Sequence, residues 1–340
     1  MSSYPFQLRN TLKFQLPKRR LGIISNGSFI SALTLFPLLS HIMKPMKVIR
    51  AKSAGFCWGV KRAIEIVQSC AAQGKNPVYT DGPLIHNKQM MSELDRIGIR
   101  EVGDYQSQSK LPLESTDEND SSVVVVRAHG VSPERRKYLK NLNTKFKDAT
   151  CPDVGIIAGK IRMYAKKGYQ TVIYGNPQHP EAIGLMGYTE GRGHFIQSRE
   201  DIDALPDLGD QVIFVSQSTM FTSEFNHLAA YLKDQYPSLR VFDTICGATK
   251  ERQGDLNKLV EQGAQAIVVI GGHHSANTMK LVLLAQRSQL PTYHIETADG
   301  IDTETMQAYS VVGVTAGAST PDFIIDAVCE KLAQIEPSNT

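Results

Sequence analysis

Apolar residues recur at helical spacing after three of the five cysteines. After Cys57 they occupy positions 60, 63, 64, 67 and 71, and after Cys151 positions 154, 157, 158, 161 and 165. A weaker series after Cys246 occupies positions 248, 256, 259 and 260. Because residues three and four apart share one helix face, each series predicts a helix with one buried side. Each helix is expected to stop at a glycine 17 residues past its cysteine: Gly74, Gly168 and Gly263.

Two short apolar strands follow in each repeat of this pattern. The first strands are expected at 77–80, 171–174 and 266–270, and the later ones at 123–126, 212–215 and 311–314. Polar residues follow the strand ends at matching distances from each cysteine: His86-Asn87, His179-Pro180-Glu181 and Ser275-Ala276-Asn277 after the first strands, and His129-Gly130, Gln217-Ser218 and Ser319 after the later ones. The cysteines themselves lie 94 and 95 residues apart, so the chain contains a threefold internal repeat.

Strands that alternate with helices predict the α/β class with parallel sheets, here as three pseudo-equivalent units. Ligands of such sheets bind beyond the carboxyl ends of the strands. Three equivalent units are therefore expected to surround one central site, each contributing one cysteine and two polar loops. The predicted division is an N-terminal extension at 1–46 and α/β units at 47–150, 151–245 and 246–335.

Composition narrows the class of protein. The chain has 340 residues, of which 41% are hydrophobic and 21% charged, as is typical of a soluble globular protein. The first 46 residues contain six basic residues and no acid, which leaves 31 basic against 34 acidic residues in the rest. A body without excess positive charge argues against nucleic-acid binding. Five scattered cysteines suit a reducing compartment, and a cytoplasmic location is expected.

The first 46 residues have no clear structural role. A basic run, Lys18-Arg19-Arg20, precedes a moderately apolar stretch that Asn26-Gly27-Ser28 and Pro37 interrupt. The stretch is a poor membrane-spanning helix and lacks a clean signal-cleavage site. A plastid-type transit peptide is one interpretation. The favoured one is an upstream start codon, with Met43 or Met46 beginning the working protein and a poorly ordered extension before it.

The three repeated cysteines are candidate metal ligands. Each precedes a helix start, where unpaired N–H groups and the helix dipole favour a thiolate. Three converging thiolates suit zinc, or an iron–sulfur cluster that keeps one iron without a protein ligand. Three buried, inert thiols are the alternative, but identical placement in the repeats favours the metal site. Cys70 and Cys329 have no repeat partners and are expected to be inert thiols in or near the core.

The polar residues at the strand ends supply many hydrogen-bond donors and one acid. Converging donors of this kind suit a phosphate or diphosphate. Glu181, the only acid among them, is a candidate general acid whose proton affinity a buried anionic site would raise, and helix capping is its alternative role. His273-His274 is expected only to line its loop, and no nucleotide-binding motif is present. The expected donors are His86, His129, His179, Ser275, Asn277 and Ser319.

Several motifs together resemble the IspH (LytB) family of 4-hydroxy-3-methylbut-2-enyl diphosphate reductases, from about Met46 to Leu332. They are Gly55-Phe56-Cys57-Trp58-Gly59-Val60, Ile85-His86-Asn87, Ala128-His129-Gly130-Val131, Asp148-Ala149-Thr150-Cys151-Pro152, His179-Pro180-Glu181 and Thr315-Ala316-Gly317-Ala318-Ser319. The resemblance implies a trefoil of three α/β units around one 4Fe–4S cluster per chain, bound by Cys57, Cys151 and Cys246. It implies the last step of the methylerythritol phosphate route, a reductive dehydroxylation that gives isopentenyl and dimethylallyl diphosphates.

The resemblance also implies roles for the other residues. His86, His129, His179, Ser275, Asn277 and Ser319 would hold the diphosphate, while Glu181, with Ser218 and His179, would supply protons. A ferredoxin or flavodoxin would supply electrons, and neither a nucleic acid nor a membrane would be a partner.

Four features depart from the family pattern. Ser218 stands where a threonine is usual, and Ala276 replaces a usual serine, which removes one diphosphate donor worth about 1.5–3 kcal/mol of binding. The loop 271–274 and Lys250-Glu251 also differ. These changes leave two alternatives beside the reductase: a non-catalytic paralogue that carries the cluster and binds or senses a diphosphate metabolite, and a zinc hydrolase of a phosphorylated metabolite.

Overall fold

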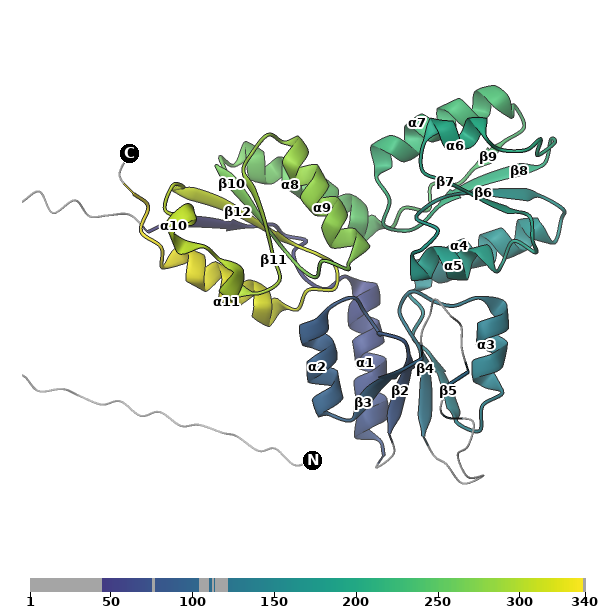
Figure 1. Ribbon diagram of the computed structural model, residues 1–340, viewed down its shortest axis with the longest axis horizontal. Coiled ribbons are helices and arrows are strands. Elements are labelled where there is room, and N and C mark those ends of the chain that lie inside the picture. Colours follow the sequence, from purple (N-terminus) through teal and green to yellow (C-terminus); the bar gives the residue numbers. More distant parts are fainter. Residues whose placement is uncertain (1–44, 75–76, 104–109, 112, 114–121, 339–340) are drawn as a thin grey trace, which may run out of the picture. The chain divides into compact units, whose positions relative to one another are not determined.

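The structure is a computed structural model that describes residues 45–74, 77–103, 110–111, 113 and 122–338. The described residues form three four-stranded sheets, and every strand pairing in them is parallel (Figure 1). The predicted α/β class with three units is therefore confirmed. Of the expected extension at 1–46, only Pro45 and Met46 belong to the described residues, and Met46 is buried in a hydrophobic core. The predicted disorder of the rest concerns residues outside the described ranges.

The sheet that follows Cys57 places its most apolar strand at the centre. Its strand order is β3 (Ile99–Val102), β2 (Val78–Asp81), β4 (Val123–Val126) and β5 (Lys145–Asp148). Strand β4 is a run of four valines whose last three side chains are fully buried, as a parallel strand covered on both faces requires. The helices of this unit are α1 (Trp58–Ala72), α2 (Lys88–Arg96) and α3 (Pro133–Lys140).

The sheet that follows Cys151 is covered by α6 and α7 on one face and by α4 and α5 on the other (Figure 1). Because successive strand residues point to opposite faces, Val172 and Tyr174 pack in one core and Ile173 packs in the other. The strand order is β7 (Gly193–Ile196), β6 (Gln170–Tyr174), β8 (Val212–Ser216) and β9 (Arg240–Val241). The helices are α4 (Pro152–Ala165), α5 (Pro180–Met186), α6 (Arg199–Asp203) and α7 (Thr222–Gln235).

The third sheet contains a strand from the other end of the chain. Its order is β1 (Lys47–Arg50), β12 (Val311–Ala316), β10 (Ala266–Ile270) and β11 (Thr292–Ile295). The predicted first unit, 47–150, is thus wrong in one respect, because β1 pairs with β12 of the third unit. The helical segments of this sheet are α8 (Gly247–Glu261), α9 (Ala276–Arg287), η1 (Ala298–Gly300), α10 (Thr303–Met306) and α11 (Asp322–Ala333).

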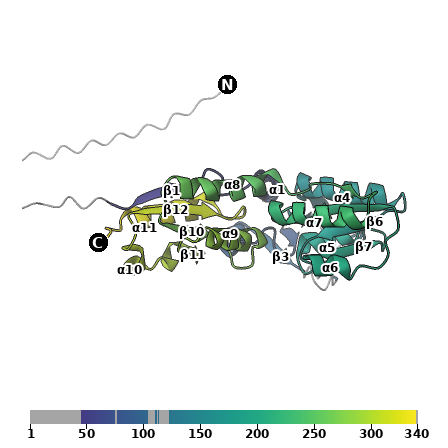
Figure 2. The same cartoon turned by 90° about the horizontal axis from the view of Figure 1, so that it is seen from above.

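This exchange makes the three sheets equivalent. In each sheet the strand at one edge leads directly to a cysteine: β5 to Cys151, β9 to Cys246 and β1 to Cys57. The helices that begin at these cysteines, α1, α4 and α8, lie along the same side of the described structure (Figure 2). Two of the predicted glycine stops adopt the left-handed conformation, Gly168 with φ +85° and Gly263 with φ +86°.

Candidate active site

Residues from all three sheets line one cavity of about 600 Å³. Cys57, Cys151 and Cys246 border it from the starts of α1, α4 and α8. The structure therefore brings together all of the residues that the sequence predicted for the site. The others that line the cavity are His86, His129, His179, Glu181, Ser218, Ser275, Asn277 and Ser319.

The same backbone hydrogen bond positions each of the three cysteines. Each cysteine follows the edge strand of one sheet. Its backbone N–H donates to a carbonyl in the loop that follows an inner strand of that same sheet. The bonds run from Cys57 to Ala318 (3.1 Å), from Cys151 to Ala128 (2.9 Å) and from Cys246 to Ser218 (3.0 Å). These acceptors lie at or next to the predicted polar tips Ser319, His129 and Ser218, so the repeat extends to the atoms that orient the thiols.

Two of the thiols are protonated more readily than free cysteine. Burial raises the pKa of Cys151 to about 11 and also raises the pKa of Cys246, and the nearby Cys57 contributes to both shifts. Desolvation thus outweighs the helix-start effect that the sequence suggested. Such thiols are poor nucleophiles, but a coordinated metal would displace their protons. Three sulfurs that converge in one cavity fit a metal or iron–sulfur centre.

Gly59 leaves the space that the Cys151 thiol occupies. A Cβ added at Gly59, in the first turn of α1, would lie 2.4 Å from Cys151 Sγ. We expect Gly59→Ala to fold, because the thiol can rotate away, but to hold much less of the iron that the three thiols are predicted to bind, because Cys151 no longer points into the cavity. Iron analysis of the purified protein measures this. Gly155→Ala in α4 is the control, since nothing lies within 4 Å of its added Cβ, and equal iron loss in both variants would contradict the prediction.

Three histidines meet at one side of the cavity. The ring centroids of His86 and His129 are 4.6 Å apart, those of His129 and His179 are 5.5 Å apart, and those of His86 and His179 are 5.8 Å apart. Burial, together with nearby positive charge, lowers the pKa of His86 to about 4 and that of His179 to about 3, and it lowers the pKa of His129 well below its usual value. The three rings are therefore neutral at pH 7 in the absence of an anionic ligand.

Several polar atoms of this region have no hydrogen-bond partner. Among the described residues, His86 Nε2, His129 Nδ1 and Asn277 Nδ2 are buried without one. Buried polar atoms are nearly always paired in folded proteins, so these atoms indicate a polar ligand in the cavity. Nitrogen donors in a pocket whose only buried carboxyl is Glu181 suit an anion such as a diphosphate.

Three of the predicted donors also have structural roles. His179 caps α5, where its Nδ1 accepts from Glu181 N at 3.2 Å, which leaves Nε2 as its proton-bearing nitrogen. Ser319 Oγ donates to the carbonyl of His86 at 3.1 Å and so links the third sheet to the first. Ser275 Oγ accepts from Thr278 N at the start of α9, and its own hydroxyl proton is still available to a ligand.

The protonation of the three histidines predicts loss of stability in acid. Between about pH 6.5 and 4 the unfolded chain binds protons that the folded chain does not, so the free energy of unfolding falls as the pH decreases. The slope is about 1.4 kcal/mol per pH unit for each such proton. Glu181 acts in the opposite direction, because its raised pKa lets the folded chain bind this proton at a higher pH than the unfolded chain does. The three histidines outweigh this single carboxyl.

Urea unfolding at about pH 7.5 and about pH 5 measures the effect. His86→Asn removes one titrating group and should show a shallower dependence on pH than the unsubstituted chain. An identical dependence in both proteins would contradict the assignment of His86 as a neutral, buried histidine.

Glu181 and Ser218 form a buried pair. Ser218 donates to the Glu181 carboxyl through its backbone N (2.6 Å) and through its Oγ (2.8 Å). The Glu181 side chain does not cap α5, so the alternative role in helix capping is wrong. Only 2% of Glu181 is exposed, and burial raises the pKa of its carboxyl despite the two hydrogen bonds. A raised pKa favours the protonated carboxyl, which is the form that a general acid needs.

Two further polar residues near the site were not predicted. Lys280, on α9, is buried enough to lower its pKa to about 8, and its positive charge affects both Glu181 and His179. Thr249, in the first turn of α8, places Oγ1 at 3.1 Å from Cys246 Sγ. Neither lies at a strand end or at a repeated offset, so no pattern in the sequence distinguishes them from other helix residues.

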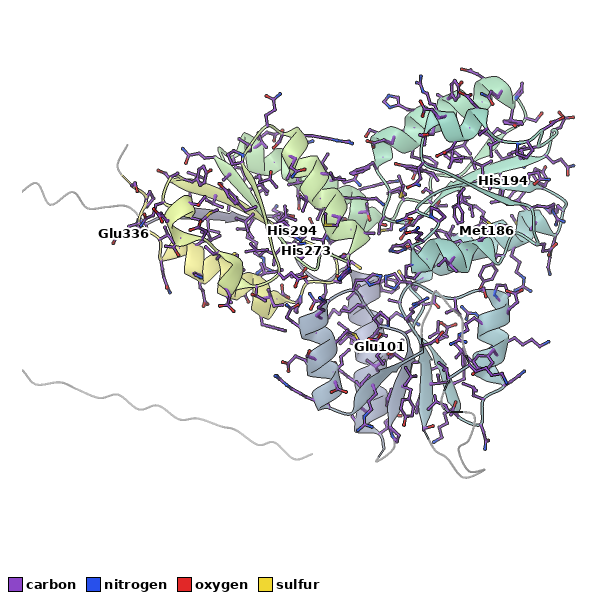
Figure 3. The ribbon with its side chains drawn as sticks, viewed as in Figure 1. Glu101, Met186, His194, His273, His294 and Glu336 are labelled. Atoms are coloured by element: carbon purple, nitrogen blue, oxygen red, sulfur yellow. The ribbon has the colours of Figure 1, made fainter. Side chains whose placement is uncertain are left out.

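The remaining polar and sulfur residues lie elsewhere, as expected. The His273 ring packs against that of His294, with ring centroids 4.2 Å apart and the planes tilted by 58°, at the end of the third sheet (Figure 3). Neither His273 nor His274 lines the central cavity. Cys70 and Cys329 pack against the cores of the first and third sheets.

Ala276 lines the cavity beside Ser275 and Asn277, so the departure from the family pattern falls within the site itself. In the changed loop, Gly271 has φ +146°, and a Cβ there would lie 2.6 Å from Thr278 Oγ1. This position therefore requires glycine.

Three parallel-sheet units that share one cavity of thiols, histidines and a buried carboxyl define an α/β protein with a single composite site. The family model described as "LytB protein" matches residues 48–333. The chain belongs to the LytB family, as its motifs suggested. No helix among the described residues is long and apolar enough to cross a membrane.

Named relatives agree with this assignment. A protein of Opitutus terrae named 4-hydroxy-3-methylbut-2-enyl diphosphate reductase is 64% identical over 287 residues, which cover 84% of this chain and 99% of that protein. A protein of Alkaliphilus oremlandii with the same name is 38% identical over 289 residues, with coverage of 84% and 99%. The solved E-1-hydroxy-2-methyl-but-2-enyl-4-diphosphate reductase from Plasmodium falciparum superposes with a TM-score of 0.75 at 27% identity and covers 83% of this chain and 86% of that one.

Proposed function

We propose that the chain is a 4-hydroxy-3-methylbut-2-enyl diphosphate reductase. The reaction breaks the bond between carbon and the hydroxyl oxygen of the substrate, and the hydroxyl leaves as water. Two electrons and two protons balance the reaction, which gives isopentenyl and dimethylallyl diphosphates. Membership of the LytB family and the names of the relatives support this proposal.

Cys57, Cys151 and Cys246 are the proposed ligands of one 4Fe–4S cluster per chain, which supplies low-potential electrons and, with three cysteine ligands, one iron open to the substrate. Their approach to one cavity, from helix starts that the same backbone hydrogen bond positions, supports this role. Cys70 and Cys329 lie in other parts of the structure and are not proposed as ligands.

The diphosphate is proposed to bind the neutral histidines and their neighbours. His86, His129 and Asn277 have buried nitrogens without partners, which the phosphate oxygens would satisfy. His179 Nε2 and the Ser275 hydroxyl are further available donors. Ser319 would join the proposed set by turning its hydroxyl from the His86 carbonyl to the ligand. Bound negative charge raises the pKa of a neighbouring histidine, so binding should be accompanied by proton uptake.

Glu181 is the proposed proton donor. Burial raises its pKa and so favours the protonated carboxyl, and the 2.8 Å bond to Ser218 Oγ orients one of its oxygens. Ser218 retains the hydroxyl of the threonine that is usual in the family, so it can pass a proton to or from Glu181. His179, whose backbone begins the same helix, holds the carboxyl in place through the first turn of α5.

One observation carries the proposal: three cysteines, three histidines and a buried carboxyl, drawn from all three sheets, line one cavity. The test is anaerobic iron and sulfide analysis combined with a turnover assay on the hydroxylated diphosphate. We expect a brown protein with about four irons per chain that releases both products. Stoichiometric zinc without iron, or binding of the diphosphate without turnover, would contradict the proposal.

Electrons are proposed to come from a ferredoxin or flavodoxin.

The non-catalytic alternative is not favoured, because the relatives at 64% and 38% identity are named as the reductase. The buried pair of Glu181 and Ser218 also argues against it, since a protein that only binds a diphosphate has no use for a buried acid near its ligand.

A further inference from the structure

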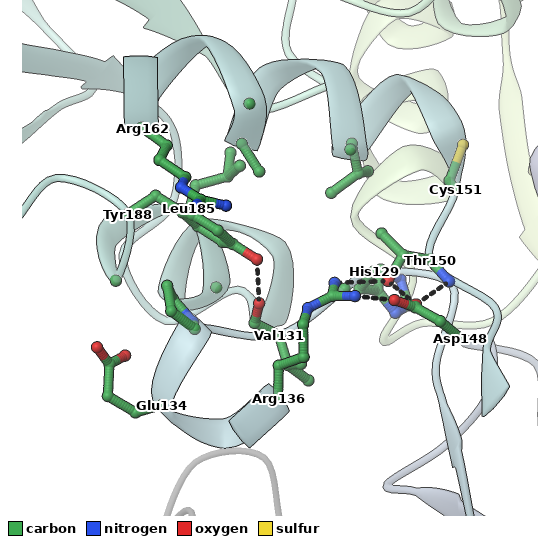
Figure 4. Close-up of a pocket in the computed structure, with 18 of the residues that line it drawn as sticks. His129, Val131, Glu134, Arg136, Asp148, Thr150, Cys151, Arg162, Leu185 and Tyr188 are labelled. Atoms are coloured by element: carbon green, nitrogen blue, oxygen red, sulfur yellow. Dashed lines mark hydrogen bonds and ion pairs between the residues drawn. The ribbon is translucent and has the colours of Figure 1, made fainter. Parts of the chain in front are cut away.

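A second cavity adjoins the central one and reaches the same thiol. This groove of about 930 Å³ lies between helices of the first and second units, and Figure 4 shows the side chains that line it. It shares Cys151, His129 and Val154 with the central cavity. Cys151 can therefore be approached from the groove without passing the predicted diphosphate donors at Ser275, Asn277 and Ser319.

The groove concentrates positive charge. The acids that line it are Asp148, which pairs with Arg136, Glu190, which pairs with Arg192, and Glu134. Apart from Arg136, the basic side chains that line the groove are Arg62, Lys137, Lys140 and Arg162. These four positive charges face the single negative charge of Glu134. From residue 47 onward, by contrast, acids slightly outnumber bases, so the positive charge of this groove is a local feature. Such a field attracts an acidic partner and accelerates its association.

The cations lie next to the segment that carries Cys151. Arg62 Nη1 donates to the carbonyl of Thr150 at 3.2 Å, and Arg136 Nη2 donates to Thr150 Oγ1 at 3.4 Å. Thr150 directly precedes Cys151, so a partner that contacts these guanidinium groups lies one residue from the thiol. Figure 4 shows Arg136, Asp148 and Thr150 at the Cys151 end of the groove, with Arg162 and Tyr188 at the other end.

Exposed apolar side chains lie on two helices that contribute residues to the groove, although they are not among its lining residues. Trp58, the single tryptophan of the chain, is 63% exposed, lies one turn before Arg62 on α1 and borders the central cavity. On α4, Ile156 is 63% and Met163 46% exposed, and their spacing of two turns places them on the same face of the helix. Tryptophan, methionine and arginine are enriched at protein interfaces, and tryptophan and arginine in their energetic centres. The surface therefore suits a protein more than a small anion.

We propose that this groove is the docking site of a small acidic electron-carrier protein, which delivers electrons to the centre through Cys151. This inference rests on the proposed function, because a reductive reaction needs an external donor. A one-electron carrier docks twice per turnover, leaves oxidised each time, and so supplies the two electrons that break the C–O bond. The substrate side of the cavity stays accessible while the carrier is bound.

Charge reversal in the groove tests the docking site. The variant is Lys137→Glu combined with Arg162→Glu, two exposed residues in the last turns of α3 and α4. The matched control is Lys233→Glu, an exposed lysine in the last turn of α7. With a reduced plant-type ferredoxin as donor, we expect the KM for ferredoxin to rise at least tenfold in the variant and to stay unchanged in the control. The KM for the diphosphate should stay the same in both.

Two further measurements separate docking from chemistry. Turnover driven by reduced methyl viologen, a small donor, should be equal in the variant, the control and the unsubstituted protein. Calorimetric binding of oxidised ferredoxin should weaken at least tenfold in the variant and lose most of its dependence on salt. This binding readout does not depend on turnover.

The possible outcomes distinguish the two proposals. If the unsubstituted protein does not turn over even with methyl viologen, the proposed function is wrong. If it does turn over, but the variant binds and uses ferredoxin as well as the control does, the docking site is wrong. Binding of a DNA duplex that the same substitutions abolish, with the KM for ferredoxin unchanged, would also overturn the docking site.

Discussion

Glu181→Gln should lower turnover by about 10²–10⁴-fold while the iron content stays at its full value. The change removes the acidic proton but keeps the size of the side chain, and proton transfer by a positioned group typically accounts for a factor of this size. The glutamine can still accept from Ser218 N, which lies 2.6 Å from the carboxyl, so the local fold should persist. Turnover with a small reductant, combined with iron analysis, measures the result.

The pH dependence of turnover adds a second readout. Because burial raises the pKa of Glu181, kcat of the unsubstituted protein should fall as the pH rises through that pKa, and this fall should be absent in the glutamine variant. Ser218→Ala should have a smaller effect of about tenfold, since it removes one hydrogen bond that orients the carboxyl. Glu224→Gln is the control, because Glu224 pairs with Arg287 outside the cavity. Near-normal turnover in Glu181→Gln would exclude this residue as the proton donor.

Replacing any one of Cys57, Cys151 and Cys246 with serine should remove the iron centre and with it all turnover. Serine keeps the side-chain shape but is a poor ligand for iron, and a cluster with only two cysteine ligands is not retained. Iron per chain should fall from about four to below one, and the brown colour should disappear. The fold should survive, because each sheet has its own hydrophobic core.

The chain provides its own controls for this experiment. Cys70→Ser and Cys329→Ser change thiols on α1 and α11 that pack near the cores and do not line the central cavity. Both should keep the full iron content and turnover. Full iron in Cys246→Ser, or complete loss in Cys70→Ser, would show that the cavity is not the iron site.

Local patterns predicted most of the fold correctly. The helices after Cys57, Cys151 and Cys246 follow from apolar spacing, and strands such as β4 and β10 have the predicted bounds. Helix periodicity and apolar strand runs are properties of neighbouring residues, which is why a single sequence reveals them. The strand Lys47–Arg50 shows the limit of this approach. Its four residues form β1, but their sequence carries no sign that the partner is β12, more than 260 residues later.

The types and spacings of the site residues were also evident from the sequence, because the threefold repeat places them at similar distances from each cysteine. The protonation states of these residues were not evident from the sequence. Burial lowers the pKa of His86 to about 4 and raises the pKa of Cys151 to about 11, and burial depends on how the three sheets pack together. Lys280 belongs to the same category, since a lysine in a helix becomes a buried charge only when the helix packs against the site.

The sequence by itself determined which elements form and which side chains stand at their ends, because helix and strand formation depend on residues close together in the chain. Only the tertiary structure decided that β1 completes the third sheet, how deeply the residues of the predicted central site are buried, and that a basic groove reaches Cys151 from a second side. These features depend on contacts between distant segments and on the loss of water around charged groups, which local sequence does not encode.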